Sequence, residues 1–275
     1  MNKIFKTIGL LGLVIFSFFY TNKTVTVLKE NDEIMIKIKE NIDKYNIDVK
    51  EANIDNDTII PGINGLKVNI NKSYEKMKKM GIYNSKYLVY DVIYPKERLK
   101  NNRNKYIISG NNKNNNVSLL FIVNDVNMLD KTIKILNNYK IKSDFFITDS
   151  FINKNGYLFN YIKNNGFNLN YYGDYSSSDF ITNNTIIKNN FKNNNFCYLE
   201  NKNKEYLNIC TLNKNYTIIP SLIIKNNMLS KVKSNIKKGS LISIYISDIS
   251  ELDLTIKYIK SKGYNIVTLN EIFDF

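Results

Sequence analysis

The second half of the sequence predicts an α/β fold built on a parallel sheet, and three observations support this prediction. From residue 117 onward, short apolar runs alternate with segments whose apolar residues recur at helical spacing. The connections between these segments are short. Hydrophobic residues make up 43% of the chain and aromatic residues 13%, which allows a large packed core. The pattern is typical of a parallel sheet, open or closed into a barrel, and about seven strands in about 160 residues favour a small, incomplete barrel.

The elements of this region follow one another in a regular order. The helix after the first strand places Leu129, Ile133 and Leu136 on one face. A second helix over 150–164 ends at Gly166, and a further helix precedes the last strand. The predicted strands are VSLLFIV at 117–123, SDFFIT at 143–148, FNLNYY at 167–172, SLISIYI at 240–246 and YNIVTL at 264–269.

A smaller module precedes this domain. Residues 25–45 carry isoleucines among charges and predict a helix, and Leu66–Ile70 alternates like a strand. A short helix over Asn71–Met80 and a strand ending at Pro95 follow. We therefore assign 25–110 to a stalk and a small α+β module. The polar run SGNNKNNN at 109–116 is expected to be a linker, and 111–275 to be the main domain.

Residues 1–24 are expected to be a signal anchor or transmembrane helix. Lys3 and Lys6 precede a mostly apolar run from Ile4 to Tyr20, as in an export signal. No small-x-small cleavage site follows, so we expect a single-pass protein of the cell membrane with the bulk of the chain outside the cytoplasm. If the signal is cleaved, the protein is secreted. The alternative is a buried helix of a soluble protein.

Charge and histidine content narrow the possible functions. The formal net charge of +14 favours anionic partners, although lysines spread over solvated faces explain it as well. No nucleic-acid-binding motif is visible, so no nucleic-acid partner is expected. The chain contains no histidine, which excludes Ser-His-Asp triads, Cys-His dyads and histidine-based zinc sites.

The two cysteines, Cys197 and Cys210, leave two alternatives open. Outside the cytoplasm they can form a disulfide, which would contribute roughly 3 kcal/mol to stability. Otherwise they are two buried thiols. No residue pattern beside them indicates a nucleophile.

Several stretches resemble the polysaccharide deacetylase (NodB-homology) family. VSLLF resembles the family's V-x-L-T-F strand, and ILNNYKIKSDFFITDSFI resembles the segment that follows it. KNNGFNLNYY lies where the family has a G-H-E-I-G-N-H stretch, and the segments from 237 to the end resemble its closing strands and helix. The resemblance covers 117–275 and implies a distorted (β/α) barrel.

The same resemblance implies that the catalytic machinery is degenerate. Active members use an Asp pair, as general base and metal ligand, two His as further ligands and a last His as general acid. The Arg-Pro segment that supports the base falls on 196–198. Because every aligned catalytic position is replaced, we expect no metal, no cofactor and no catalytic residue. The family's catalytic positions correspond here to Ile122, Val123, Tyr172, Ser176 and, for the last His, approximately Tyr245.

Four aspartates follow predicted strands and are weak candidates for a cleft. Together they could bind a hard cation such as Ca²⁺ or Mg²⁺ through oxygen ligands. Alternatively they cap helices or lie solvated in loops. These residues are Asp125, Asp149, Asp174 and Asp248.

The favoured hypothesis is a membrane-anchored pseudoenzyme outside the cytoplasm that binds a cell-wall glycan or an anionic wall polymer. Tyrosines at strand ends would stack on sugar rings, although each is also an ordinary core or surface residue in a tyrosine-rich chain. One alternative is an active carbohydrate N-deacetylase with a non-standard site, and another is a structural envelope protein whose contact surface is 25–110. The tyrosines are Tyr171, Tyr172, Tyr175, Tyr198 and Tyr245.

Overall fold

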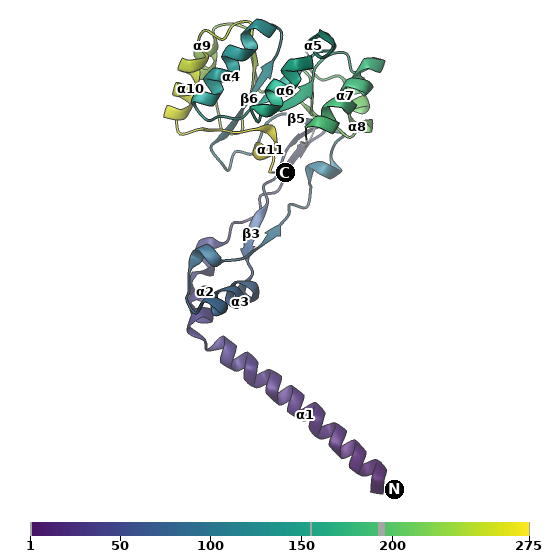
Figure 1. Cartoon of the computed structure of the whole chain (residues 1–275), viewed down its shortest axis with the longest axis vertical. Coiled ribbons are helices and arrows are strands. Elements are labelled where there is room, and N and C mark those ends of the chain that lie inside the picture. The colour runs from purple at the N-terminus through teal and green to yellow at the C-terminus, as the bar shows by residue number, and fades with distance from the viewer. Residues whose placement is uncertain (1, 155, 192–195, 275) are drawn as a thin grey trace. The chain divides into compact units, whose positions relative to one another are not determined.

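The computed structural model describes residues 2–154, 156–191 and 196–274, which form two compact units (Figure 1). The first unit contains the chain up to Val49 together with Asn64–Ile93, and the second contains Lys50–Ile63 together with the chain from Tyr94 onward. The division therefore differs from the predicted boundary at 110. The polar run predicted as a linker also belongs to the second unit, where the Gly110 amide donates to the carbonyl of Gly239 at 2.8 Å.

The first unit packs helices α2 (Glu33–Tyr45) and α3 (Ile70–Met80) with an antiparallel pair, β3 (Gly65–Val68) and β4 (Tyr90–Ile93). A short 3₁₀ turn, η1, spans Ser85–Tyr87. The sequence predicted one helix over 25–45, but helix α1 (Asn2–Glu30) ends first and α2 begins anew. The reason is local, because the Asp32 carboxylate accepts the Ile34 amide and caps α2.

Helix α1 is apolar and exposed. Among the described residues, its segment Ile8–Glu30 is long and apolar enough to cross a membrane, properties that a signal sequence shares. Its large side chains, such as Leu10, Phe16 and Phe19, are 68–69% exposed, so no protein core covers them. This exposure disagrees with the alternative of a buried helix in a soluble protein.

The second unit is an α/β fold with parallel strands, as predicted. Its six-stranded sheet has the order β11-β12-β6-β7-β8, with β13 also paired to β6, and every pair is parallel. The predicted strand over 264–269 is confirmed only in part, because a helix begins within it. The strands are β6 (Asn116–Ile122), β7 (Asp144–Ile147), β8 (Asn168–Tyr171), β11 (Leu222–Ile224), β12 (Leu241–Tyr245) and β13 (Asn265–Ile266).

A second, five-stranded sheet has the order β1-β2-β5-β10-β9. Only β1 and β2 are antiparallel. The strand hydrogen bonds of the described residues thus define two sheets, and they do not confirm a closed barrel. The strands are β1 (Asn53–Asp55), β2 (Thr58–Ile60), β5 (Tyr106–Ile107), β9 (Phe196–Tyr198) and β10 (Tyr216–Ile218).

Helices and 3₁₀ turns connect these strands. The single helix predicted over 150–164 corresponds to α5, which begins one residue earlier, and α6, with residue 155 outside the described residues. The other predicted helices of this unit are present. The helices are α4 (Leu129–Asn138), α5 (Asp149–Lys154), α6 (Gly156–Asn164), α7 (Ser178–Asn190), α8 (Lys204–Leu212), α9 (Met228–Asn235), α10 (Leu252–Ser261) and α11 (Leu269–Ile272), and the turns are η2 (Leu99–Asn101) and η3 (Val126–Met128).

Strand β6 is buried on both faces and lies at the centre of the unit. Its residues Leu119 and Phe121 pack in the larger core, which contains the buried faces of the helices. Its alternate residues Leu120 and Ile122 pack in a second core with side chains of the five-stranded sheet, such as Ile218. Because successive side chains of a strand point to opposite faces, a strand buried on both sides is a continuous apolar run.

A buried carboxylate lies at the start of β7. Asp144 is 1% exposed and accepts the Leu269 amide at 2.7 Å and the Asn168 side-chain amide at 3.0 Å. Burial raises the pKa of Asp144 from 3.8 to about 6. In the unfolded chain the group ionises at its ordinary pKa, so the folded protein binds the proton more tightly.

We therefore expect Asp144 to make folding stability fall as pH rises. The contribution is fully present below pH 4 and is lost as the pH passes through about 6, with a total of roughly 3 kcal/mol. Asp144→Asn removes the titration, so urea unfolding at pH 4.5 and 7 should show a smaller pH dependence in the variant. Asp179→Asn, at an exposed position on α7, is the control. Equal pH dependence in wild type and Asp144→Asn would contradict this assignment.

Candidate functional site

The candidate site lies at the carboxyl ends of β6, β8, β9 and β12. Ile122 is 1% exposed and Val123 is 4% exposed. Ile122 is paired in register with Phe146 on one neighbouring strand and with Tyr245 on the other. The two positions where the family resemblance places an Asp pair therefore hold buried alkyl side chains without a proton-accepting or metal-binding atom.

The resemblance to the deacetylase family places that family's two metal-binding histidines at Tyr172 and Ser176. Tyr172 is half-buried and its hydroxyl lies 3.3 Å from that of Tyr245. The Ser176 hydroxyl donates to the Asp174 carboxylate at 2.6 Å. Two alkyl groups, a phenol and an engaged hydroxyl do not fit the divalent metal that the family fold implies.

Four polar side chains form a network at this site. The Tyr245 hydroxyl donates to the Glu200 carboxylate at 2.5 Å, and the Lys225 ammonium lies 3.1 Å from the same carboxylate. The ammonium also lies 5.2 Å from the centroid of the Tyr245 ring. Tyr172 joins the network through its hydroxyl contact with Tyr245. We call Tyr172, Glu200, Lys225 and Tyr245 the Tyr-Glu-Lys network.

The network sets the protonation states of its members. Burial, and then the hydrogen bond to Glu200, raises the pKa of Tyr245 well above its ordinary value. The hydrogen bond from Tyr245 lowers the pKa of Glu200, and Lys225 acts in the same direction. At neutral pH the network consists of a neutral phenol that donates to an ionised carboxylate.

The sequence did not single out Glu200 or Lys225. Glu200 follows β9, a three-residue strand too short for periodicity to reveal, and Lys225 follows the equally short β11. The only feature of the sequence that could have indicated these two residues is their position. Both residues lie just beyond an apolar triplet, where parallel strands deliver their side chains to one edge of a sheet.

Three of the five tyrosines proposed for sugar stacking are buried, which corrects that prediction. Tyr171, Tyr175 and Tyr198 are at most 2% exposed. The Tyr175 hydroxyl accepts the Tyr198 amide at 2.8 Å and donates to its carbonyl at 3.0 Å, which joins the loop after β8 to β9. Rings enclosed in this way cannot stack on a ligand. Tyr172 and Tyr245 remain partly accessible.

Tyr198 is buried and packs against Tyr172 of the Tyr-Glu-Lys network. Its ring meets that of Tyr172 edge to face at 5.3 Å between centroids. Its hydroxyl lies 2.9 Å from that of Ser243 on β12. Burial raises the pKa of Tyr198 above its ordinary value, so the hydroxyl stays neutral. Tyr198 is thus a packing residue that fixes the position of Tyr172.

The carboxylates of the four candidate aspartates accept hydrogen bonds from other side chains or backbone amides and do not converge on one site. Asp125 caps η3, and Asp248 accepts the amide and hydroxyl of Ser250. Asp149 accepts the Tyr171 hydroxyl at 2.8 Å. Asp174 accepts the amide and hydroxyl of Ser176 and the hydroxyl of a tyrosine on α8. Among the described residues, acidic and cysteine side chains form no group of three suited to a metal ion. Of the four aspartates only Asp125 caps a helical segment, while Asp174 and Asp248 lie in loops and Asp149 is the first residue of α5.

Cys197 and Cys210 form a disulfide, the first of the two alternatives. Cys197 lies on β9 and Cys210 on α8, and both are fully buried. The bond therefore ties the strand that precedes Glu200 to the helix that follows it. It contributes to the candidate site by holding β9 in place.

Comparison with known proteins identifies one curated relative by sequence. No protein-family model matches the chain. The uncharacterized protein YlxY of Bacillus subtilis (strain 168) is 34% identical over 145 residues, which are 52% of this chain and 46% of that protein. The chain therefore matches about half the length of this relative.

Solved structures with the same fold include two carbohydrate esterase family proteins. BA3943 of Bacillus anthracis, described as a CE4 family pseudoenzyme, has a TM-score of 0.67 at 22% identity, over 89% of this chain and 96% of that chain. The Bc1960 peptidoglycan N-acetylglucosamine deacetylase has a TM-score of 0.54 at 20% identity, over 62% of this chain and 92% of that chain. These likenesses confirm the deacetylase-type fold that the sequence motifs predicted.

Proposed function

From a fold shared with CE4 family deacetylases, we propose that this chain is a deacetylase-like protein of the cell envelope that binds glycan without metal-dependent deacetylation. The observation that carries the proposal is the pair of buried alkyl side chains, Ile122 and Val123, at the end of β6. The chain also contains no histidine to supply an acid or a metal ligand. The comparison with a CE4 family pseudoenzyme supports the same conclusion.

The Tyr-Glu-Lys network supports ligand binding at this site. The rings of Tyr172 and Tyr245 are partly accessible and can contact the apolar face of a sugar. The ionised Glu200 carboxylate can accept hydrogen bonds from sugar hydroxyls, which are donors. A neutral phenol and an engaged carboxylate do not supply a free general base near neutral pH.

The N-terminal helix supports attachment to the membrane. The segment Ile8–Glu30 is long and apolar enough to span a bilayer, and its apolar side chains are exposed. We propose that α1 anchors the chain as a single span, with the two units outside the cytoplasm. Such a placement is compatible with the disulfide, because disulfides persist in oxidising compartments.

Titration of the full chain with chito-oligosaccharides and peptidoglycan fragments tests this function. We expect binding that weakens by about tenfold in Tyr245→Phe with Glu200→Gln, because hydrogen-bonding groups to the ligand are lost. Tyr157→Phe with Glu205→Gln alters the same residue types at exposed positions and should leave the affinity unchanged. No glycan binding by wild type would remove the proposal.

An assay of acetate release separates binding from catalysis. We expect no release from N-acetylated glycans above that of a heat-unfolded sample. Release that disappears in Glu200→Gln, Asp125→Asn or Asp149→Asn would instead establish an active deacetylase with a non-standard site.

A further inference from the structure

A second pocket lies at the opposite ends of the same strands. It is open, has a volume of about 300 Å³, and belongs entirely to the second unit. The loop over 109–112 precedes β6 and the loop over 237–240 precedes β12, and these two strands are parallel. The pocket therefore lies beside their amino ends, while the Tyr-Glu-Lys network lies at their carboxyl ends. Its lining includes Lys50, Glu51, Asn111, Asn112, Lys237 and Lys238.

Lysines from separate parts of the chain gather at this pocket. Lys50 comes from the segment before β1, and Lys237 and Lys238 come from the loop before β12. The Lys50 ammonium donates weakly to the Asn112 side chain at 3.5 Å. None of the ion pairs found in the described chain includes these three lysines. The one carboxylate in the lining, Glu51, accepts the Lys96 amide at 2.8 Å.

Buried backbone contacts hold the lysine-bearing segments together. Gly110 and Gly239 are in direct contact, with the Gly110 amide donating to the Gly239 carbonyl at 2.8 Å. A Cβ atom at Gly239 would lie 2.2 Å from the Gly110 carbonyl oxygen, and the φ of +81° also favours glycine. Buried Asn111 donates to the Pro61 carbonyl at 2.9 Å, and Lys50 pairs with Ile63 through two backbone hydrogen bonds. These backbone contacts thus bring three lysines from two segments of the chain to one pocket.

We propose that this lysine pocket binds a phosphodiester-bearing ligand. Three lysines against one engaged carboxylate give the pocket a positive charge, which attracts an anion. Lysine is an established phosphate-binding residue and acts there as a compact point charge, and three lysines line this pocket. The volume exceeds that of a bare phosphate ion and suits a phosphate with its attached alcohol groups.

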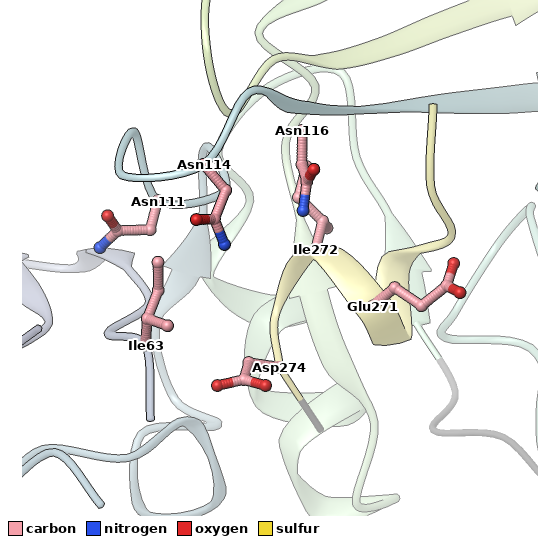
Figure 2. A pocket seen from close by; sticks show the side chains of 7 residues that line it. All are labelled: Ile63, Asn111, Asn114, Asn116, Glu271, Ile272 and Asp274. Atoms are coloured by element: carbon pink, nitrogen blue, oxygen red, sulfur yellow. The ribbon is translucent and has the colours of Figure 1, made fainter. Parts of the chain in front are cut away.

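The adjoining pocket explains why the ligand belongs to the lysine pocket. It shares Asn111, has a volume of about 60 Å³ and is lined by Asp274 and by Glu271, whose carboxylate points away from the other lining side chains (Figure 2). The Glu271 carboxylate is already engaged with the amide and hydroxyl of Thr268. Asp274 also lines this smaller pocket, so its charge favours an anion less there than in the pocket lined by the three lysines.

The test uses the detergent-solubilised full chain and three probes. They are inorganic phosphate, a glycerol-phosphate trimer and dihexanoyl phosphatidylglycerol, with dihexanoyl phosphatidylcholine as the zwitterionic control. We expect the trimer or the anionic lipid to bind more tightly than inorganic phosphate, with affinity that falls as salt is added. Binding of the trimer identifies a polymer as the source of the phosphodiester, and binding of the lipid alone identifies a headgroup. Absence of binding to both the trimer and the anionic lipid, whether or not inorganic phosphate binds, would overturn the proposal.

Two double variants that each remove two positive charges distinguish binding at the pocket from attraction to the net positive charge of the chain. Lys237→Gln with Lys238→Gln should weaken binding by about tenfold or more. Lys163→Gln with Lys204→Gln removes the same two charges at exposed positions outside the pocket and should change affinity less than about twofold. Equal weakening in both double variants would refute a specific site. Circular dichroism confirms that each variant is folded.

The glycan titration keeps the two proposals distinct. The variant at Lys237 and Lys238 should bind chito-oligosaccharides as wild type does, and the variant at Glu200 and Tyr245 should bind the phosphodiester as wild type does. Loss of phosphodiester binding in the Glu200 and Tyr245 variant would place that ligand at the Tyr-Glu-Lys network and overturn the lysine pocket.

Discussion

Ile122→Asp is expected to destabilise the protein by on the order of 4 kcal/mol at pH 7. Ile122 is 1% exposed and packs in the second core, so a carboxylate at this position would be ionised without water or a cationic partner. The loss should be smaller at pH 4.5, because a buried Asp can take up a proton. Urea unfolding at both pH values measures it.

Two further substitutions at the same position isolate the charge. Ile122→Val removes one methylene group and should cost about 1 kcal/mol at either pH. Ile122→Asn has nearly the shape of Asp and does not titrate, so its destabilisation should be the same at both pH values. If Ile122→Asp were as stable as wild type at pH 7, the assignment of Ile122 to a core without water would fail.

Removal of the disulfide by Cys197→Ala with Cys210→Ala should lower the free energy of unfolding by roughly 3 kcal/mol. The larger part of this loss is expected from the greater freedom of the unfolded chain. Reduction of wild type with dithiothreitol should move its urea midpoint to that of the double variant. Identical midpoints for oxidised wild type and the double variant would show that the cysteines are not joined in solution.

The parallel sheet around β6 could be predicted from the sequence because its longer strands are continuous apolar runs. Strand β6 is an apolar run buried on both faces, and its predicted range of 117–123 differs from the observed Asn116–Ile122 by one residue at each end. The sheet with β1, β2, β5, β9 and β10 was not predicted, since these strands have only two or three residues. Such short segments form strands because the surrounding fold pairs them, and their own periodicity carries little information.

The sequence predicted which catalytic residues are missing from the candidate site, but it did not predict most of the residues that form the site. Ile122 and Val123 were identified because an apolar pair stood where acidic residues were expected. The partners Glu200 and Lys225 come from two short strands that only the three-dimensional structure brings beside Tyr245. Which tyrosines are buried was also beyond the sequence, because the two cores are formed only in the folded chain. Tyr171, the last residue of β8, packs in the larger core, whereas Tyr172, directly after it, packs against the second core.

The insertion of residues 64–93 between β2 and β5 has a consequence for biosynthesis. The first unit has all its elements once Ile93 has left the ribosome, and it can fold at once. Strand β5 pairs with β2 immediately, but its other partner, β10, is synthesised on the order of ten seconds later at ordinary rates. During that interval one edge of β5 lacks its partner, so we expect nascent chains that end before Tyr216 to aggregate more readily than the whole chain.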